Sequence, residues 1–420
     1  MSKLAYAALW VFVFTVSAEP TFRGFGVVPS RVTGPVAVGL TLLTIVLTGR
    51  LRRWHPFHIT ALLFVAWIGL GLLFFYTQWL ELPNRFWTYI QLFLVLWIVW
   101  ETAATRSRQR GLMGAYVLGA SVSAIDTIIL FQRKAEMMRR FAAGGVDNND
   151  LAMMLALAIP MAWYLATTSR QLIRRWLCTA YLPIALFAIG LTGSRGGMLT
   201  TMIALLIVPL TLTRLSPLRR GIAIGLLWIS GAFALAYVPQ TLMERLASTT
   251  GEVEEGGIGG RMKIWIAGLR AFTASPLVGH GPASFIRAVD PYLIARAQVA
   301  HNSFLSVLVE SGLPGFLLFF GMFLTAFLAI LKLPYLERRY SLVLFFALGL
   351  STLPLSSEES KRVWIVLALL VGLSQAYVNS GVGGPLGTRL SRPAVPPGGP
   401  AQRREPMTLP LRTINRKAAE

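Results

Sequence analysis

Apolar stretches long enough to cross a lipid bilayer recur along the whole 420-residue chain. A membrane-spanning α-helix needs about 20 predominantly apolar residues, and a soluble protein of this length could not bury so many such stretches. Charged residues make up only 14% of the sequence, against roughly 25% in soluble domains. Backbone exposed to lipid must satisfy its own hydrogen bonds, so the spans are predicted to be helices. The predicted fold class is an all-α polytopic membrane protein.

Hydropathy predicts about twelve transmembrane helices. They lie near residues 4–18, 35–49, 58–76, 87–104, 111–131, 151–168, 177–192, 197–213, 221–238, 303–331, 341–355 and 362–378. The first follows Lys3 and ends in Val16-Ser17-Ala18, which also resembles a signal-peptide cleavage site. A retained helix is preferred because it gives an even number of spans. Residues 1–380 are therefore predicted to form one transmembrane domain.

The basic residues predict the orientation of the spans. With the N-terminus in the cytoplasm, every predicted cytoplasmic loop carries three basic residues, as the positive-inside rule expects. These residues are Arg50, Arg52 and Arg53; Arg106, Arg108 and Arg110; Arg170, Arg174 and Arg175; Arg214, Arg219 and Arg220; and Lys332, Arg338 and Arg339. Because the positive charge is spread through short loops, the net charge of +21 does not indicate nucleic-acid binding.

The C-terminal segment 381–420 differs in composition from the rest of the chain. It is rich in Pro, Gly and Arg and lacks apolar periodicity. We expect a disordered, basic cytoplasmic tail that can contact anionic membrane lipids. Both termini are then cytoplasmic.

The longest predicted loop, residues 239–301, lies on the non-cytoplasmic side. Within it, residues 261–273 show helical spacing of apolar residues, which predicts an amphipathic helix at the membrane interface. The predicted apolar side comprises Met262, Trp265, Leu269 and Phe272, and the predicted polar side comprises Arg261, Lys263 and Arg270.

Two groups of external cations are not explained by the positive-inside rule. The loop before the sixth span holds Arg133, Lys134, Arg139 and Arg140, which either anchor lipid locally or meet an anionic substrate. Arg195 lies in the turn Thr192–Gly197 between the seventh and eighth spans. Its guanidinium either binds phosphate oxygens in a bidentate manner or extends from a helix end towards the membrane surface.

His301 is the external residue best suited to proton transfer. A lone histidine is more often structural, but this one shares a side of the membrane with Arg195 and Arg261. Neighbouring guanidinium groups should lower its pKa and keep it neutral, so that it can accept a proton. Cations and a neutral base at the membrane surface predict chemistry on a lipid-linked phosphate.

The sequence requires no metal and no disulfide. No cluster of carboxylates, histidines or cysteines has metal-ligand spacing, and the single cysteine, Cys178, falls inside an apolar span. Asp147 and Asp150 precede or begin the sixth span. A helix N-cap with favourable dipole charge explains them more simply than a bound cation.

Over about residues 145–330 the sequence resembles the O-antigen ligase and polymerase family of bacterial envelope glycan assembly. The matching elements, in order, are Asn149-Asp150-Leu151-Ala152, Ser194-Arg195-Gly196, Gly260-Arg261 with Ile264-Trp265, Pro276–Pro282, His301–Leu305 and Glu310–Gly315. The first five spans resemble the family only in hydropathy.

This resemblance implies a GT-C-like, metal-independent, inverting glycosyltransferase without cofactors in the bacterial inner (cytoplasmic) membrane, with a periplasmic active site. The donor would be a glycan on undecaprenyl diphosphate, and the acceptor a lipid A-core sugar for a ligase or another glycan for a polymerase. By position, Arg195 and Arg261 would bind the diphosphate, and His301 would be the catalytic base or orient the acceptor hydroxyl. Lys263 and Asn302 are further candidate contacts.

A transporter of polysaccharide or lipid is the alternative from a different class. Such a protein should carry ionisable residues at mid-membrane depth. Only Asp126 and Glu101 qualify in the sequence, and both are better interpreted as packing residues or span ends. The enzyme is therefore the preferred prediction.

Overall fold

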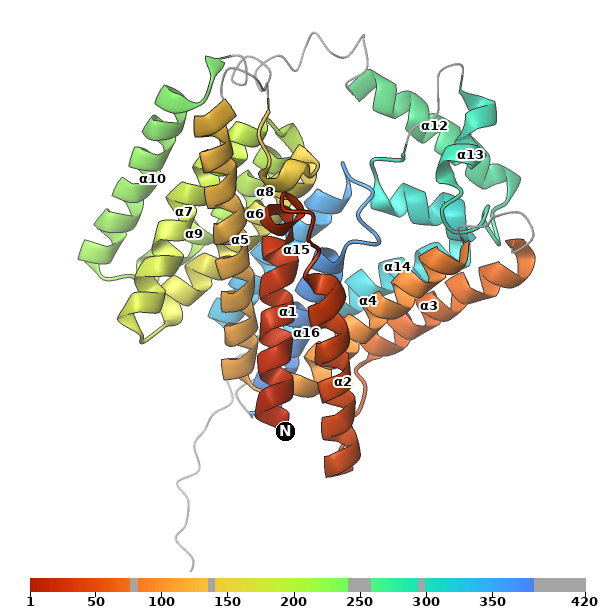
Figure 1. The fold of residues 1–420 in the computed structure, drawn as a ribbon, viewed down its shortest axis with the longest axis horizontal. Coiled ribbons are helices and arrows are strands. Elements are labelled where there is room, and N and C mark those ends of the chain that lie inside the picture. Colours follow the sequence, from red (N-terminus) through yellow and green to blue (C-terminus); the bar gives the residue numbers. More distant parts are fainter. Residues whose placement is uncertain (76–81, 135–139, 241–257, 294–298, 381–420) are drawn as a thin grey trace, which may run out of the picture. The chain divides into compact units, whose positions relative to one another are not determined.

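The computed structural model describes residues 1–75, 82–134, 140–240, 258–293 and 299–380, and all regular structure within these ranges is helical. The main helices (Figure 1) are α1 (Ser2–Arg23), α2 (Ser30–Thr48), α3 (Pro56–Phe75), α4 (Leu82–Thr102), α5 (Arg106–Lys134), α6 (Asn148–Thr168), α7 (Leu172–Thr192), α8 (Arg195–Leu205), α9 (Ile207–Thr211), α10 (Pro217–Tyr237), α12 (Ile258–Ala274), α13 (Phe285–Val289), α14 (Ser303–Leu331), α15 (Tyr335–Thr352) and α16 (Lys361–Val378). Each predicted span coincides with a helix, the eighth with α8 and α9 together.

The helical membrane architecture is confirmed, while the number twelve stays a prediction. Within the described residues, eight helical segments are long and apolar enough to cross a membrane. They are Ser2–Arg23, Ser30–Thr48, Arg106–Lys134, Asn148–Thr168, Leu172–Thr192, Arg195–Arg214, Ser303–Leu331 and Lys361–Val378. The predicted tail, 381–420, lies outside the described residues.

Helix α6 forms the centre of the core. Every residue from Leu151 to Ala166 is buried, and α6 packs against α5, α7, α8 and α15. Its alanines keep the helix narrow, so neighbouring helices approach closely. Helix α16 is buried along most of its length as well. These two helices begin beside each other at the same end, where the candidate site lies.

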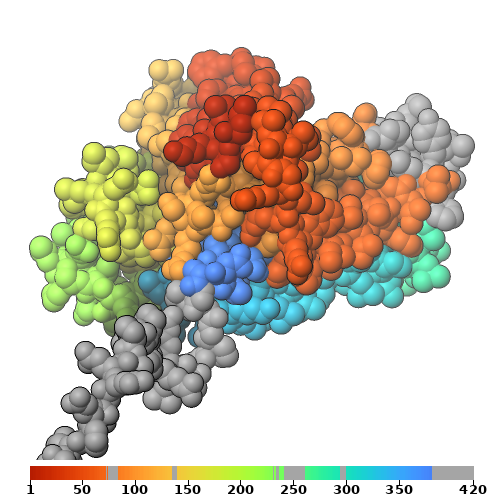
Figure 2. Space-filling model, turned by 90° about the horizontal axis from the view of Figure 1, so that it is seen from below, coloured from red at the N-terminus to blue at the C-terminus, as the bar shows by residue number. Residues whose placement is uncertain are grey.

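The opposite end of the bundle gathers residues that the topology predicts to be cytoplasmic. Arg110 donates hydrogen bonds to the hydroxyls of Tyr164 and Tyr377, and Tyr377 donates to Glu337 at 2.7 Å. The start of α5 thus meets the ends of α6 and α16, as alternating spans require. Figure 2, which views this end, shows the end of α16 (blue) at the surface near the N-terminal segments.

Helix α14 is broken near its N-terminal end. Gly312 has a φ of 66°, a left-handed conformation that glycine adopts without steric cost. A Cβ at Gly312 would lie 2.4 Å from the carbonyl oxygen of Leu277, and one at Gly279 would lie 2.5 Å from the backbone of Glu310. The two sequence motifs 276–282 and 310–315 therefore pack against each other through their backbones.

The predicted amphipathic helix is present as α12. Ile264, Ala267 and Ala271 are buried in a small core with Phe285 of α13 and Leu305 of α14. Of the predicted apolar side, Trp265 and Phe272 pack against this core, while Met262 and Leu269 are exposed, by 47% and 52%. The sequence did not identify the side of α12 that α13 and the start of α14 cover. Its position at a membrane interface stays a prediction.

Candidate functional site

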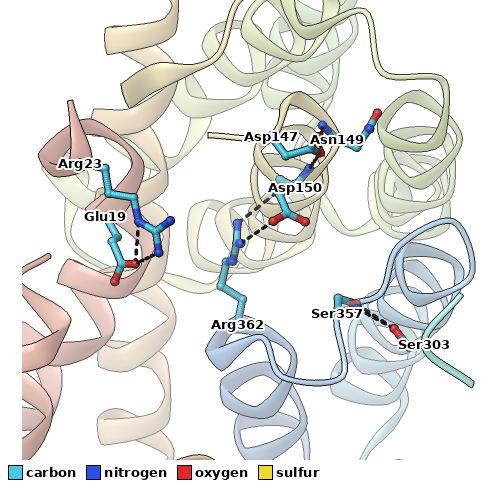
Figure 3. A network of polar contacts seen from close by, with 8 residues as sticks. All are labelled: Glu19, Arg23, Asp147, Asn149, Asp150, Ser303, Ser357 and Arg362. Carbon is cyan, nitrogen blue, oxygen red and sulfur yellow. Dashed lines mark hydrogen bonds and ion pairs between the residues drawn. The ribbon is translucent and has the colours of Figure 1, made fainter. Parts of the chain in front are cut away.

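The start of α6 is tied to the start of α8 by side-chain hydrogen bonds. Asp147 caps α6, and its carboxylate accepts the backbone N–H groups of Asn149 and Asp150, which confirms the N-cap interpretation (Figure 3). The Oδ1 atom of Asn149 accepts a hydrogen bond from Ser194 Oγ at 2.8 Å. Ser194 in turn caps α8 by accepting the N–H of Gly197. Arg195 is therefore held as the first residue of α8.

Glycines bring the turn before α8 close to α6. Gly193 ends α7 with a φ of 58°, which lets the chain reverse sharply. A Cβ at Gly197 would lie 2.3 Å from the Cβ of Ala152. Small residues on both helices thus fix the distance between the α6 and α8 N-termini.

Helix α12 is fastened to the residue before His301. Trp265 Nε1 donates a hydrogen bond to the carbonyl of Ala300 at 3.0 Å. His301 has a φ of 46°, an uncommon value for a residue other than glycine. Asn302 then caps α14 by accepting the N–H groups of Phe304 and Leu305. This turn places the imidazole directly before the α14 N-terminus.

Arg195, Arg261 and His301 lie close enough for the arginine charges to affect the pKa values of Arg261 and His301. The pKa of Arg261 is lowered by burial and then by the charge of Arg195, while Asp147 opposes the shift. The pKa of His301 is lowered first by burial and then by the charge of Arg261, and Asp147 again opposes the shift. His301 is therefore biased towards the neutral form, as expected, although burial contributes more than the guanidinium.

The remaining predicted residues lie in different settings. Arg140 donates to the carbonyl of Thr192 at 2.7 Å and to Asn149, so its guanidinium joins the loop before α6 to the α7–α8 turn. Arg133 and Lys134 are exposed in the last turn of α5. Lys263 is exposed on α12, and Asn302 uses its side chain as the α14 cap. Arg139 lies outside the described residues.

Three hydrogen bonds to the α15–α16 connection were missed by the sequence reasoning. Ser303 donates to the carbonyl of Leu355 at 2.8 Å. It also accepts the N–H of Ser357 at 2.8 Å (Figure 3). Ser306 donates to Glu358 at 2.7 Å. This connection therefore supports the first turn of α14, directly after His301. The only signal in the sequence was the position of these serines beside the His301 motif.

Two acidic residues within helices were left out when the sequence was searched for acids in the spans. Glu19 lies in α1, where it pairs with Arg23 at 2.7 Å. Glu310 lies in α14, where its carboxylate accepts the N–H groups of Ala283 and Phe285 at 3.0 and 3.2 Å. Glu310 thus holds the start of α13 and has a structural partner. Glu310 lies within the predicted span 303–331 and adds to the two acids that the sequence reasoning considered, whereas Glu19 lies one residue beyond the predicted span 4–18.

A small cleft lies beside the packed segments 276–282 and 310–315. Its lining includes Trp67 of α3, Pro282 and Glu310. None of the predicted site residues lines this cleft, so it is separate from the group around His301. The chemistry of the chain is better sought at the arginines and the histidine.

Comparison with known proteins agrees with the predicted resemblance. Residues 180–320 match the family model described as O-antigen ligase. The matched range contains Arg195 and Arg261 of the electrostatically coupled group, together with His301. No curated protein matches the chain. The resemblance to the O-antigen ligase family, predicted from six short motifs, is therefore confirmed over this range.

Proposed function

We propose that this membrane protein transfers a glycan from undecaprenyl diphosphate to an acceptor hydroxyl at the periplasmic face, as an O-antigen ligase acting on lipid A-core. The observation that carries the proposal is the grouping of Arg195, Arg261 and His301 at the starts of α8, α12 and α14. The O-antigen ligase match over residues 180–320 supports a ligase-type enzyme.

The site suits a diphosphate because helix N-termini and guanidinium groups coincide there. Helices α8 and α14 begin at the site with uncharged caps, and each N-terminus carries a partial positive charge. Arg195 and Arg261 add two fixed charges whose planar forks suit phosphate oxygens. The pKa of Arg261 is lowered by burial and then by repulsion from Arg195, and a bound dianion would offset that repulsion.

The transfer step follows from these roles. Neutral His301 accepts the proton of the acceptor hydroxyl as the oxygen attacks the anomeric carbon of the donor sugar. The bond from that carbon to the diphosphate oxygen breaks, and undecaprenyl diphosphate leaves with the electron pair. Arg195 and Arg261 stabilise the charge that develops on the leaving group. Attack from the face opposite the diphosphate inverts the anomeric configuration.

The proposal is tested by replacing each of the three residues with alanine and measuring attachment of glycan to the acceptor. We expect transfer to fall by about a hundredfold or more, the usual effect of losing a catalytic base or a charge-stabilising donor. Full activity in any of the three variants would remove that residue from the site. Because the mechanism uses no metal, chelators should leave transfer unchanged.

A polymerase of the same family would use the same donor and base, and the product of a gene deletion separates the two activities. Loss of a ligase leaves long lipid-linked polymer without an acceptor. Loss of a polymerase leaves single repeat units on the acceptor. Loss of a transporter would instead leave the glycan on the cytoplasmic side.

A further inference from the structure

A second group of cations lies beside the candidate site. We call it the α1–α16 basic cluster; its members are Arg23 at the end of α1, Arg31 at the start of α2, and Lys361 and Arg362 at the start of α16. Lys361 lies within electrostatic reach of the other three. The sequence reasoning did not identify this cluster, because its two halves are more than 300 residues apart along the chain.

The carboxylates at the cluster fix its geometry without neutralising it. Glu19 pairs with Arg23 at 2.7 Å and lies 3.8 Å from Lys361 Nζ. Asp150 faces Arg362 at 3.5 Å and also offers its backbone carbonyl to the same guanidinium at 3.1 Å (Figure 3). Three of the four cations contact these two carboxylates and Arg31 contacts neither, which leaves an excess of positive charge.

Arg31 is the member with the most freedom to bind a ligand. It is exposed, and no hydrogen bond or ion pair engages its side chain among the residues that the structure describes. Its position is set by α2, whose first residue, Ser30, accepts a hydrogen bond from Lys361 at 2.7 Å. A guanidinium held beside other cations, with its donors available, favours an anion with several oxygens.

The cluster is continuous with the candidate site through the first turn of α6. Asp150, which holds Arg362, lies one helical turn from Asp147, which is electrostatically coupled to Arg261 and His301. The short 3-10 helix Ala143–Gly145, which precedes α6, packs on the end of α1. A Cβ at Gly144 would lie 1.7 Å from the carbonyl oxygen of Pro20. The two groups of cations therefore flank the same helix N-terminus.

We propose that the α1–α16 basic cluster is a second anion subsite, which takes a phosphate group carried by the acceptor while the first group holds the donor diphosphate. The assignment to the acceptor rests on the proposed function. The phosphate chemistry follows from the charge excess and the available guanidinium of Arg31. The same chemistry would also accept the phosphate of a neighbouring phospholipid headgroup, and the experiment separates these two sources.

The test uses the full-length protein in phosphatidylcholine nanodiscs and two probes. One is a core-oligosaccharide glycolipid that carries sugar phosphates, and the other is the same glycolipid after phosphatase treatment. Arg31→Ala should weaken binding of the phosphorylated probe about tenfold, equivalent to about 1.4 kcal/mol, and Arg31→Glu should weaken it further. Binding of the dephosphorylated probe should not change. Arg270→Ala, which removes an exposed cation from α12, is the matched control and should bind both probes normally.

A second arm measures retention of phosphatidylglycerol by native mass spectrometry. A loss of this lipid in Arg31→Glu, with glycolipid binding intact, would assign the phosphate to the phospholipid and overturn the acceptor assignment. Unchanged binding of both ligands in Arg31→Glu would overturn the subsite altogether. Binding is measured without glycan transfer, so the two proposals can fail separately. If Arg31 is needed for binding but the protein transfers no glycan, the proposed function is refuted and the phosphate subsite is supported.

Discussion

Trp265 donates a hydrogen bond from its indole nitrogen to the carbonyl of Ala300 at 3.0 Å. This bond joins the helix that carries Arg261 to the residue that precedes His301. Together with the small core shared by α12, α13 and α14, this contact positions Arg261 relative to His301. The charge of Arg261 contributes to the lowered pKa of His301, after burial.

Trp265→Phe should keep an aromatic ring packed at this position but remove the Nε1–H hydrogen-bond donor. A neutral hydrogen bond contributes about 0.5–1.5 kcal/mol, so we expect kcat to fall by about three- to tenfold as Arg261 loses its fixed position. The melting temperature should change by only a few degrees. Measurement of kcat for the purified variant checks the prediction, and an unchanged value would show that the bond does not position the site.

Arg261→Gln should shift the acidic limb of the pH–rate profile. The charge of Arg261 lowers the pKa of His301, so its removal should raise that pKa. A base must be unprotonated to act, and the activity of the variant should therefore begin to fall at a higher pH than that of the parent protein. Rate measurements between pH 5 and 8 test this. A limb at the same pH in both proteins would contradict the role of His301 as the base.

Gly312→Ala should destabilise the fold. The φ of 66° at this position, and the 2.4 Å that would separate an added Cβ from the Leu277 carbonyl oxygen, leave no space for a side chain. We expect the free energy of unfolding to fall by more than about 1 kcal/mol. Gly349→Ala is the control, because a Cβ there meets nothing within 4 Å and the helix should gain about 0.5–1 kcal/mol. Thermal unfolding in detergent compares the two, and equal melting temperatures would be inconsistent with the close contact.

Glu358→Gln should reduce the pH dependence of stability. Burial, with a smaller contribution from Glu359, raises the pKa of Glu358 to about 7. The folded state therefore binds a proton more tightly than the unfolded state does, and stability should fall as pH rises from about 4.5 to about 7. A glutamine can still accept the Ser306 hydrogen bond but cannot ionise. Melting curves at pH 5 and pH 8 should differ less for the variant, and an identical difference would refute the prediction.

The sequence predicted the helices well because hydropathy depends on local composition. It also predicted the association of Arg195, Arg261 and His301, since alternating spans placed all three on one side of the membrane. It could not predict the hydrogen bond between Ser303 and Leu355, which joins residues 52 positions apart. The ion pair of Asp150 and Arg362, 212 positions apart, was likewise beyond local patterns.

The buried side of α12 shows a different limit of the sequence. Helical spacing identified Met262 and Leu269 as apolar, but spacing alone cannot distinguish a side that packs on protein from one that faces lipid. In the structure Ile264, Ala267 and Ala271 form the centre of the protein contact, and Trp265 and Phe272 pack at its edge. The small size of the two alanines made this side inconspicuous in the sequence.

The break of α14 at Gly312 separates the first turns of this helix from its longer apolar part. Leu305 and Val309 of these turns pack with α12 and α13 in a small core, so Arg261 and His301 are supported by shared contacts. Arg195 is positioned instead by the contact of the α8 start with α6. Under the proposed function, a donor diphosphate bound by both arginines would therefore connect residues that different helices support.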